Sequence, residues 1–142
     1  MTKKLIKINT NLEITIMDFP NADWLQQHKA FCSIIGNDCG LYQIIAPKNL
    51  YEYFPVTNQA TADQHAVVML VDEEGLLKPN PQFNAFASWL YDTKAHGHPI
   101  AGNVLIVAEE FINDDYELAG LDEEEAKMLV SIMKKIIGNP QK

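Results

Sequence analysis

Six side chains that could hold a ligand cluster in the second half of the sequence. The first three are spaced four and three residues apart, so a helix would place them along one ridge. Two histidines follow in a His-Gly-His-Pro loop, where glycine permits an unusual backbone and proline fixes the exit. Amide, hydroxyl and imidazole groups all form directed hydrogen bonds, which predicts a ligand cleft here. The residues are Asn84, Ser88, Tyr91, His96, His98 and Asn103.

A second interpretation of the same segment stays open. Polar side chains between a helix and a loop often bind main-chain groups instead of a ligand, and both histidines could be turn residues. His-x-His is also a common partial metal motif. Its candidate third ligands, Asp92, His65 and His28, lie at no diagnostic spacing. We therefore predict no metal and no cofactor at this segment.

Two cysteines form a second group of potential ligands. Cys32 and Cys39 lie seven residues apart, and His28 precedes Cys32 by one helical turn. A structural zinc site takes four ligands, whereas this segment supplies three. We interpret the cysteines as reduced thiols that pack as small hydrophobic side chains.

Sequence signatures of common enzymes are missing. The chain contains no Gly-x-Gly-x-x-Gly or Walker-type loop and no Gly-x-Ser-x-Gly elbow. The adjacent carboxylates Glu73-Glu74 and Glu109-Glu110 are interpreted as solvated residues at strand ends. The sequence favours a binding protein over an enzyme and assigns no catalytic residue. The alternative is a hydrolase, or a metal-assisted enzyme, that uses the loop of His96 and His98.

The charge balance excludes several partners. The net charge is −8, and all eleven basic side chains are lysines. Arginine is the preferred residue for bidentate recognition of phosphate and guanine, and an acidic protein repels the phosphate backbone, so we expect no nucleic-acid binding. The longest apolar runs, 66–71 and 104–108, are far shorter than the ~20 residues of a membrane span, and no secretory signal opens the chain. We therefore expect a cytoplasmic protein that does not bind membranes.

The apolar pattern predicts the elements that must position these residues. Alternating or continuous apolar runs between turn residues predict strands, and apolar residues three or four apart predict helices. Asn80 would cap the second helix, and Gly138 with Pro140 would end the last. We expect strands at 5–8, 12–16, 33–35, 41–45, 66–71, 104–108 and 116–118, and helices at 21–32, 81–91 and 122–138. The first two strands would form a hairpin, 33–35 and 41–45 a second hairpin around a turn at 36–40, and 116–118 an edge strand.

Together these elements predict a single α+β domain over residues 1–142. We expect a mostly antiparallel sheet with about three helices packed on it and the C-terminal helix capping the sheet. The stretch from Pro47 to Gln64 lacks a period and is expected to be a mobile excursion. It contains an aromatic patch, Tyr51, Tyr53 and Phe54, through which the chain could form a homo-oligomer.

The region from Val68 to about Ile137 resembles a bacterial and phage family called domain of unknown function 3846. The resemblance rests on Asp72-Glu73-Glu74-Gly75-Leu76-Leu77, on Asn84 with Ala87-Ser88-Trp89-Leu90-Tyr91, on His96-Gly97-His98-Pro99-Ile100-Ala101-Gly102-Asn103, and on Gly120-Leu121-Asp122. It implies a small accessory protein, often carried by phage or conjugative elements, with no known catalytic residues. The excursion at 47–64 departs from the family.

Resemblance and composition together predict a module that binds a small ligand or a protein partner. For a mobile-element protein, one specific version is sequestration of a nucleotide that serves as a host defence signal. Another is inhibition of a host protein through the acidic surface. The lack of arginine counts against the nucleotide version.

Overall fold

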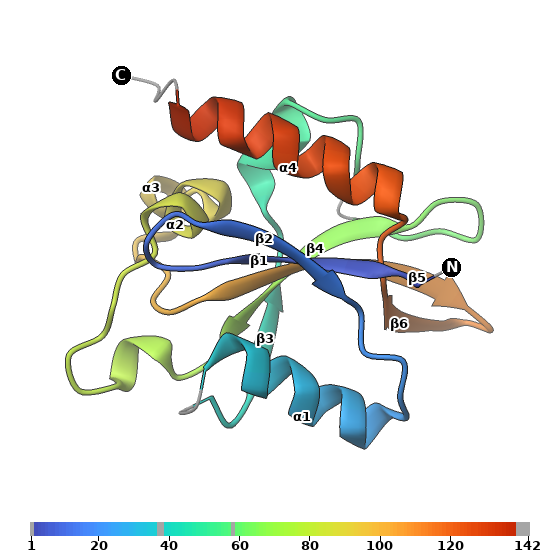
Figure 1. Ribbon diagram of the computed structural model, residues 1–142, viewed down its shortest axis with the longest axis horizontal. Coiled ribbons are helices and arrows are strands. Elements are labelled where there is room, and N and C mark those ends of the chain that lie inside the picture. The colour runs from blue at the N-terminus through green and yellow to red at the C-terminus, as the bar shows by residue number, and fades with distance from the viewer. Residues whose placement is uncertain (1, 37–38, 58, 139–142) are drawn as a thin grey trace.

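In the computed structural model, which describes residues 2–36, 39–57 and 59–138, a six-stranded antiparallel sheet carries helices on both faces (Figure 1). The strand order is β2-β1-β5-β4-β3, and β6 pairs with the second half of β5. The strands are β1 (Lys4–Ile8), β2 (Ile14–Asp18), β3 (Tyr42–Ile45), β4 (Ala66–Asp72), β5 (Val104–Ile112) and β6 (Asp115–Ala119). The helices are α1 (Trp24–Ile35), α2 (Ala85–Tyr91), α3 (Thr93–His96) and α4 (Glu123–Gly138), with two short 3₁₀ turns, η1 (Lys48–Glu52) and η2 (Gly75–Leu77).

Strand β5 organises the sheet because it is long enough to pair with three neighbours. Its first half pairs with β1, its second half with β6, and its other edge with β4. The turn from β5 to β6 contains Asn113 and Asp114 with φ of 52° and 62°, as in a type I′ hairpin. After β6 the chain continues past Gly120, and Leu121 exchanges two main-chain hydrogen bonds with Lys4. Strands β1 and β6 therefore lie end to end along one edge of β5.

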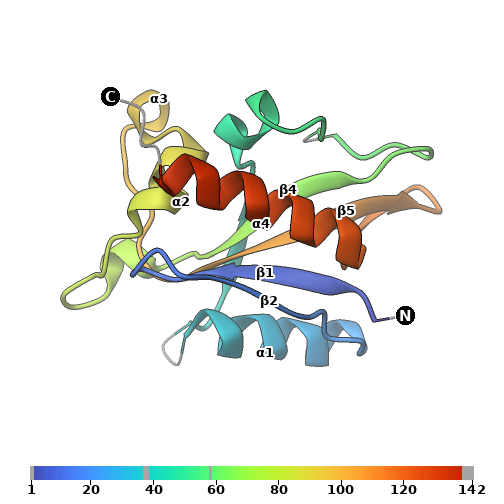
Figure 2. The same cartoon turned by 45° about the horizontal axis from the view of Figure 1, so that its top comes forward.

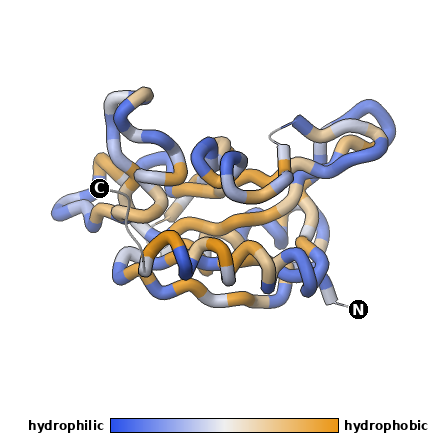
Figure 3. The backbone as a smooth tube through the Cα atoms, turned by 90° about the horizontal axis from the view of Figure 1, so that it is seen from above, coloured by the Kyte–Doolittle hydropathy of each residue, from blue (hydrophilic) through white to orange (hydrophobic). Residues whose placement is uncertain are grey.

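Alternation along the strands creates one hydrophobic core on each face of the sheet. Ile106 and Ala108 face α4 and α2, whereas Leu105 and Val107 face α1. Figure 2 shows α4 and α1 on opposite faces of the sheet. In Figure 3 the strands are coloured mainly hydrophobic and the projecting loops mainly hydrophilic. The fold is a three-layer arrangement, helix over sheet over helix.

The predicted α+β class, the antiparallel sheet and the C-terminal helix on it are confirmed. Helix α4 begins with three glutamates, which stabilise the positive end of its dipole, and its buried residues Ala126, Leu129 and Met133 pack against the sheet. The predicted hairpin of β1 and β2, the buried strands β4 and β5 and the edge strand β6 are also confirmed. The predicted turn residues 37–38, and Pro140, lie outside the described residues.

Two predicted elements are wrong. The strand at 33–35 is the last turn of α1, because this helix starts from the Asp23 cap and runs on until Ile35 is buried against the sheet. The helix expected from Pro81 begins only at Ala85: Asn80 has a φ of 54°, and the side chain of Asn84 caps the helix by accepting from the Ala87 N–H.

The excursion at 47–64 packs closely on the rest of the protein where it is described. Leu50 in η1 is fully buried in the core beneath α4, and Ala60 is buried in the core beneath α1. Asn49 Nδ2 donates to the Trp89 carbonyl, and Tyr51 Oη donates to the Val67 carbonyl at 2.7 Å. The segment thus covers the part of β4 that β3 leaves unpaired. Its mobility stays a prediction.

Candidate functional site

The structure places Asn84, the first predicted ligand residue, inside the protein. Its side chain is fully buried and accepts from the Ala87 N–H at 2.9 Å. Its amide nitrogen donates to the carbonyls of Ile8 at 3.1 Å and of Gly102 at 3.0 Å. The side chain therefore holds the start of α2 against β1 and the loop before β5. Its hydrogen-bonding groups face main chain and not a cleft.

Ser88 and Asn103 also hold neighbouring segments together through hydrogen bonds to main-chain groups. Ser88 Oγ accepts from the Ile100 N–H at 2.9 Å and so fixes the loop after α3 to α2. Asn103 Oδ1 accepts from the Thr10 N–H at 3.2 Å, and Asn103 Nδ2 donates to the Ile35 carbonyl at 2.8 Å. Asn103 also lines a cavity of about 300 Å³, but its amide is already engaged there. For these residues the second interpretation, binding of main-chain groups, describes the structure.

Tyr91, His96 and His98 are brought together in a small exposed cluster. The rings of Tyr91 and His96 stack with centroids 4.0 Å apart, and the Tyr91 hydroxyl lies 3.4 Å from His98 Nε2. His96 Nδ1 donates to the Asp92 carbonyl at 3.0 Å. Within the described residues, no three potential ligands converge closely enough to hold a metal ion. The six predicted residues therefore fall into two groups: three bind main chain, whereas three form a surface cluster. The first group is Asn84, Ser88 and Asn103, and the second is Tyr91, His96 and His98.

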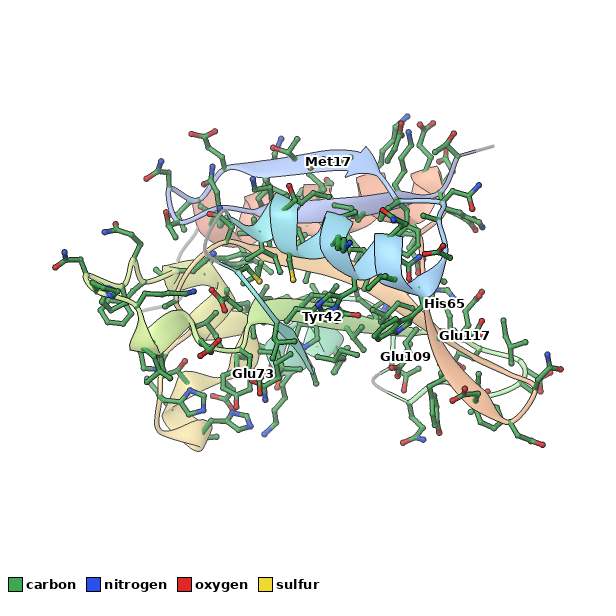
Figure 4. The ribbon with its side chains drawn as sticks, turned by 90° about the horizontal axis from the view of Figure 1, so that it is seen from below. Met17, Tyr42, His65, Glu73, Glu109 and Glu117 are labelled. Carbon is green, nitrogen blue, oxygen red and sulfur yellow. The ribbon has the colours of Figure 1, made fainter. Side chains whose placement is uncertain are left out.

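A different part of the molecule has the shape of a binding site. Beside the start of α1, a cavity of about 440 Å³ opens over the exposed part of the sheet face that α1 covers. We call it the α1 groove. A volume of this size lies within the range of small-molecule pockets. The side chains that define it are Trp24 from α1, Tyr42 and Ile44 from β3, Glu109 from β5, and Tyr116 and Leu118 from β6. In Figure 4, which looks onto the face of the sheet that carries α1, Tyr42 and Glu109 both lie beside this helix.

One aromatic wall of the α1 groove is organised by His28. The His28 ring stacks on Trp24, with centroids 5.8 Å apart, and lies 4.9 Å from the ring of Tyr42. Tyr42 in turn meets the buried Phe31 edge to face at 5.6 Å. Trp24 itself remains 74% exposed although it belongs to a helix whose other aromatic residue is buried. The helix thus presents a large flat ring at the rim of the groove.

A further aromatic residue, Tyr116 on β6, also lines the groove. This side chain is 49% exposed, and its ring lies 5.0 Å from Phe111, its partner across the hairpin. Gln59 Nε2 donates to its hydroxyl at 3.3 Å, so the excursion at 47–64 also steadies this side chain. Two well-supported rings therefore line the groove from elements far apart in the sequence.

The floor of the groove carries a carboxylate. Glu109 follows Leu105 and Val107 on the α1-facing side of β5 and lies opposite Leu118 of β6. Partial burial raises the pKa of Glu109 above its usual value, because removal from water disfavours the charged form. In the described part of the chain no hydrogen bond or ion pair reaches this carboxylate. The expected position of Glu109-Glu110 at a strand end is wrong, since β5 continues to Ile112; Glu110 is exposed to solvent as expected, whereas Glu109 is partly buried.

The surroundings of Glu109 are acidic. Asp115 and Glu117 also line the groove, and no basic side chain is found among its described lining residues. The Asp115 carboxylate accepts from the Tyr116 N–H at 2.9 Å, which leaves its negative charge without a cationic partner there. The groove therefore combines aromatic faces with uncompensated negative charge.

Cys32 lies further along α1 and Cys39 lies in the segment between α1 and β3, and both line a separate cavity of about 320 Å³. Both are free thiols, and His28 Nε2 lies 3.8 Å from Cys32 Sγ. Burial, together with the neighbouring Cys32 thiol, raises the pKa of Cys39 to about 12. Cys39 is therefore protonated at neutral pH and a weak nucleophile.

Sequence reasoning did not find Trp24, Tyr42, Glu109 or Tyr116. One signal was present: Glu109 occupies an alternate position that Leu105 and Val107 assign to a buried face. The other three could not be found, because the groove depends on how α1, β3 and β6 converge, and no spacing in the sequence encodes that convergence.

Comparisons with known proteins add no relative, since no protein family, no curated protein and no solved structure matches the chain. The resemblance to domain of unknown function 3846 accordingly stays a prediction. In the described part of the chain, the helices are too short or too polar to cross a bilayer.

Proposed function

We propose that this protein is a small-ligand-binding module and that its ligand occupies the α1 groove. The observation that carries the proposal is a cavity of about 440 Å³ whose lining includes two exposed rings, Trp24 and Tyr116, each supported by a second ring. Exposed aromatic rings cost hydration free energy, and a flat ligand stacked on them would remove that apolar surface from water. Ligand sites are concave and contain polar groups that fix the orientation of the ligand, and the groove combines its aromatic residues with such polar groups.

The groove fits this function better than the cluster of Tyr91, His96 and His98. That cluster is a set of rings stacked on one another, with His96 bound to main chain. A ligand there would have to displace an existing stack. In the α1 groove Trp24 and Tyr116 come from different elements, and the Glu109 carboxylate in the same lining has no hydrogen-bond or ion-pair partner among the described residues.

Several finer expectations belong to the same proposal. We place the protein in the cytoplasm of a bacterium and, from the resemblance, among the accessory proteins of phage or conjugative elements. Sequestration of a nucleotide defence signal is less compatible with a groove lined by carboxylates, because phosphate groups would be repelled. Inhibition of a host protein through the acidic surface remains the second version, and homo-oligomer formation through the patch of Tyr51, Tyr53 and Phe54 remains a third.

The proposal is tested with a library of aromatic fragments by thermal shift and by quenching of tryptophan fluorescence. We expect hits that raise Tm and quench the wild type but not Trp24→Ala. Phe83→Ala is the matched control, because Phe83 is another exposed ring, 56% accessible, away from the groove. Fragments that still bind to Trp24→Ala but no longer bind to His96→Ala or His98→Ala would show that the site is the predicted loop and not the α1 groove. A complete lack of hits would remove the small-ligand function.

A further inference from the structure

We propose that the ligand of the α1 groove is an organic cation, namely an ammonium group attached to a flat apolar ring. This inference rests on the proposed function, because it names the class of ligand for the same groove. It is carried by the presence of Glu109 and the aromatic residues Trp24, Tyr42 and Tyr116 in the lining of one cavity, and by the absence of basic side chains from the described lining residues.

The rings supply the first half of the recognition. A cation over the face of an aromatic ring is attracted by the negative charge of the π system, most strongly at tryptophan and then at tyrosine. Trp24 and Tyr116 expose 74% and 49% of their surface, and Tyr42 on β3 lines the same cavity. A ligand ring can stack on the same surfaces, so both parts of the molecule find a partner.

Glu109 supplies the second half. Its carboxylate has no cation or donor among the described residues, so an incoming ammonium group would not compete with an existing ion pair. The site is partly desolvated, and the pKa of Glu109 is raised for that reason. An ammonium group would form a charge-assisted hydrogen bond with the Glu109 carboxylate and so replace the water that partial burial removes from it.

The charge of the groove also selects against other ligands. Asp115 and Glu117 on β6 add to the negative potential around Glu109, so an anion would be repelled. A neutral ring would gain the stacking but not the ion pair. The order of affinity expected is therefore cation first, neutral molecule second and anion last.

The experiment compares three probes of nearly the same size. They are 2-phenylethylamine, 2-phenylethanol and 3-phenylpropionate, which are cationic, neutral and anionic at pH 7. Binding is measured by calorimetry and by tryptophan fluorescence, at two salt concentrations, for the wild type and for Glu109→Gln. The matched control is Glu110→Gln, which removes the same charge from the next residue of β5. Glu110 lies outside the α1 groove and lines a different cavity.

We expect the amine to bind the wild type about tenfold more tightly than the alcohol, and the carboxylate to bind least. Glu109→Gln should remove most of this preference and leave the alcohol unchanged, whereas Glu110→Gln should preserve it. The inference is overturned if amine and alcohol bind equally well, or if both Gln variants weaken the amine alike, since the latter would mean general attraction to an acidic protein. Equal binding that is lost in Trp24→Ala would still support the proposed function. If no probe binds, and the fragment library also gives no hit, both proposals fall.

Discussion

Replacing Asn84 with alanine tests whether this residue is part of the framework or part of a ligand site. The substitution removes the cap of α2 and leaves three main-chain groups without their partner: the Ala87 N–H and the carbonyls of Ile8 and Gly102. Loss of a cap costs about 1 kcal/mol, and each buried group left unpaired costs about 1 kcal/mol more. Because the cap and the Ala87 N–H are the same bond, the sum is about 3 kcal/mol.

That loss should be visible in solution. An unfolding entropy of about 2 cal/mol/K per residue over this chain converts about 3 kcal/mol into a fall in Tm of about 10 °C. Urea unfolding with an unchanged m-value should return the same free energy. Asn84→Ser is the informative second variant, because serine keeps the cap but lacks the two amide donors and should recover about 1 kcal/mol.

Asn11→Ala is the control, since Asn11 is an exposed residue of the turn between β1 and β2. A loss below about 1 kcal/mol for Asn84→Ala would refute the structural role assigned to the side chain. If Asn84→Ala leaves the stability unchanged but abolishes ligand binding, Asn84 belongs to the ligand site that its spacing predicts.

Three further predictions concern other parts of the fold. Gly120→Ala should destabilise the protein by about 2 kcal/mol or more in urea unfolding, because a Cβ at this position would lie 2.8 Å from the Cβ of Phe19; a neutral result would mean that the junction of β6 and β1 gives way easily. Cys39, with a pKa of about 12, should react with iodoacetamide at pH 8 at least roughly tenfold more slowly in the folded protein than in urea, and equal rates would contradict its burial. Glu109→Gln should raise Tm at pH 7 and lose that advantage near pH 4. The folded state binds the Glu109 proton more tightly than the unfolded state, so the wild type loses stability as pH rises through the ordinary glutamate pKa to the raised one. Equal Tm values for the wild type and Glu109→Gln at pH 7 would contradict the desolvation of the Glu109 carboxylate.

Much of the framework could be predicted from the sequence because local signals and tertiary packing agree there. Strands β4 and β5 are continuous apolar runs, and both central strands are buried on two faces. Helix α4 combines acidic residues in its first turn with an apolar stripe, and the structure uses both. At such positions propensity, periodicity and charge all favour the same element.

The errors arise where a tertiary contact decides between local alternatives. Residues 33–35 are β-branched or small enough to suggest a strand, but burial of Ile35 keeps them in α1. Asn80 and Asn84 are both acceptable caps. The loop of Ile100 and Gly102 settles the choice, because its carbonyls bind the main chain and side chain of Asn84.

The predicted site illustrates the same limit. Spacing correctly indicated that Asn84 and Ser88 share one side of a helix, but it could not show that the loop before β5 covers that side. The α1 groove is built from residues more than ninety positions apart, Trp24 and Tyr116, and its existence depends on the strand order. The identity of β3 as the neighbour of β4 had no signature in the sequence.

The central claim is that the α1 groove is the binding site. Its most direct test is to map which residues a bound aromatic ligand perturbs. A ¹H–¹⁵N chemical-shift map at saturation with the best fragment reports every amide at once. We expect the largest shifts at Trp24, Tyr42, Glu109 and Tyr116, with the indole N–H of Trp24 among them. Shifts centred on His96 and His98, or shifts spread evenly over the acidic surface, would contradict the assignment.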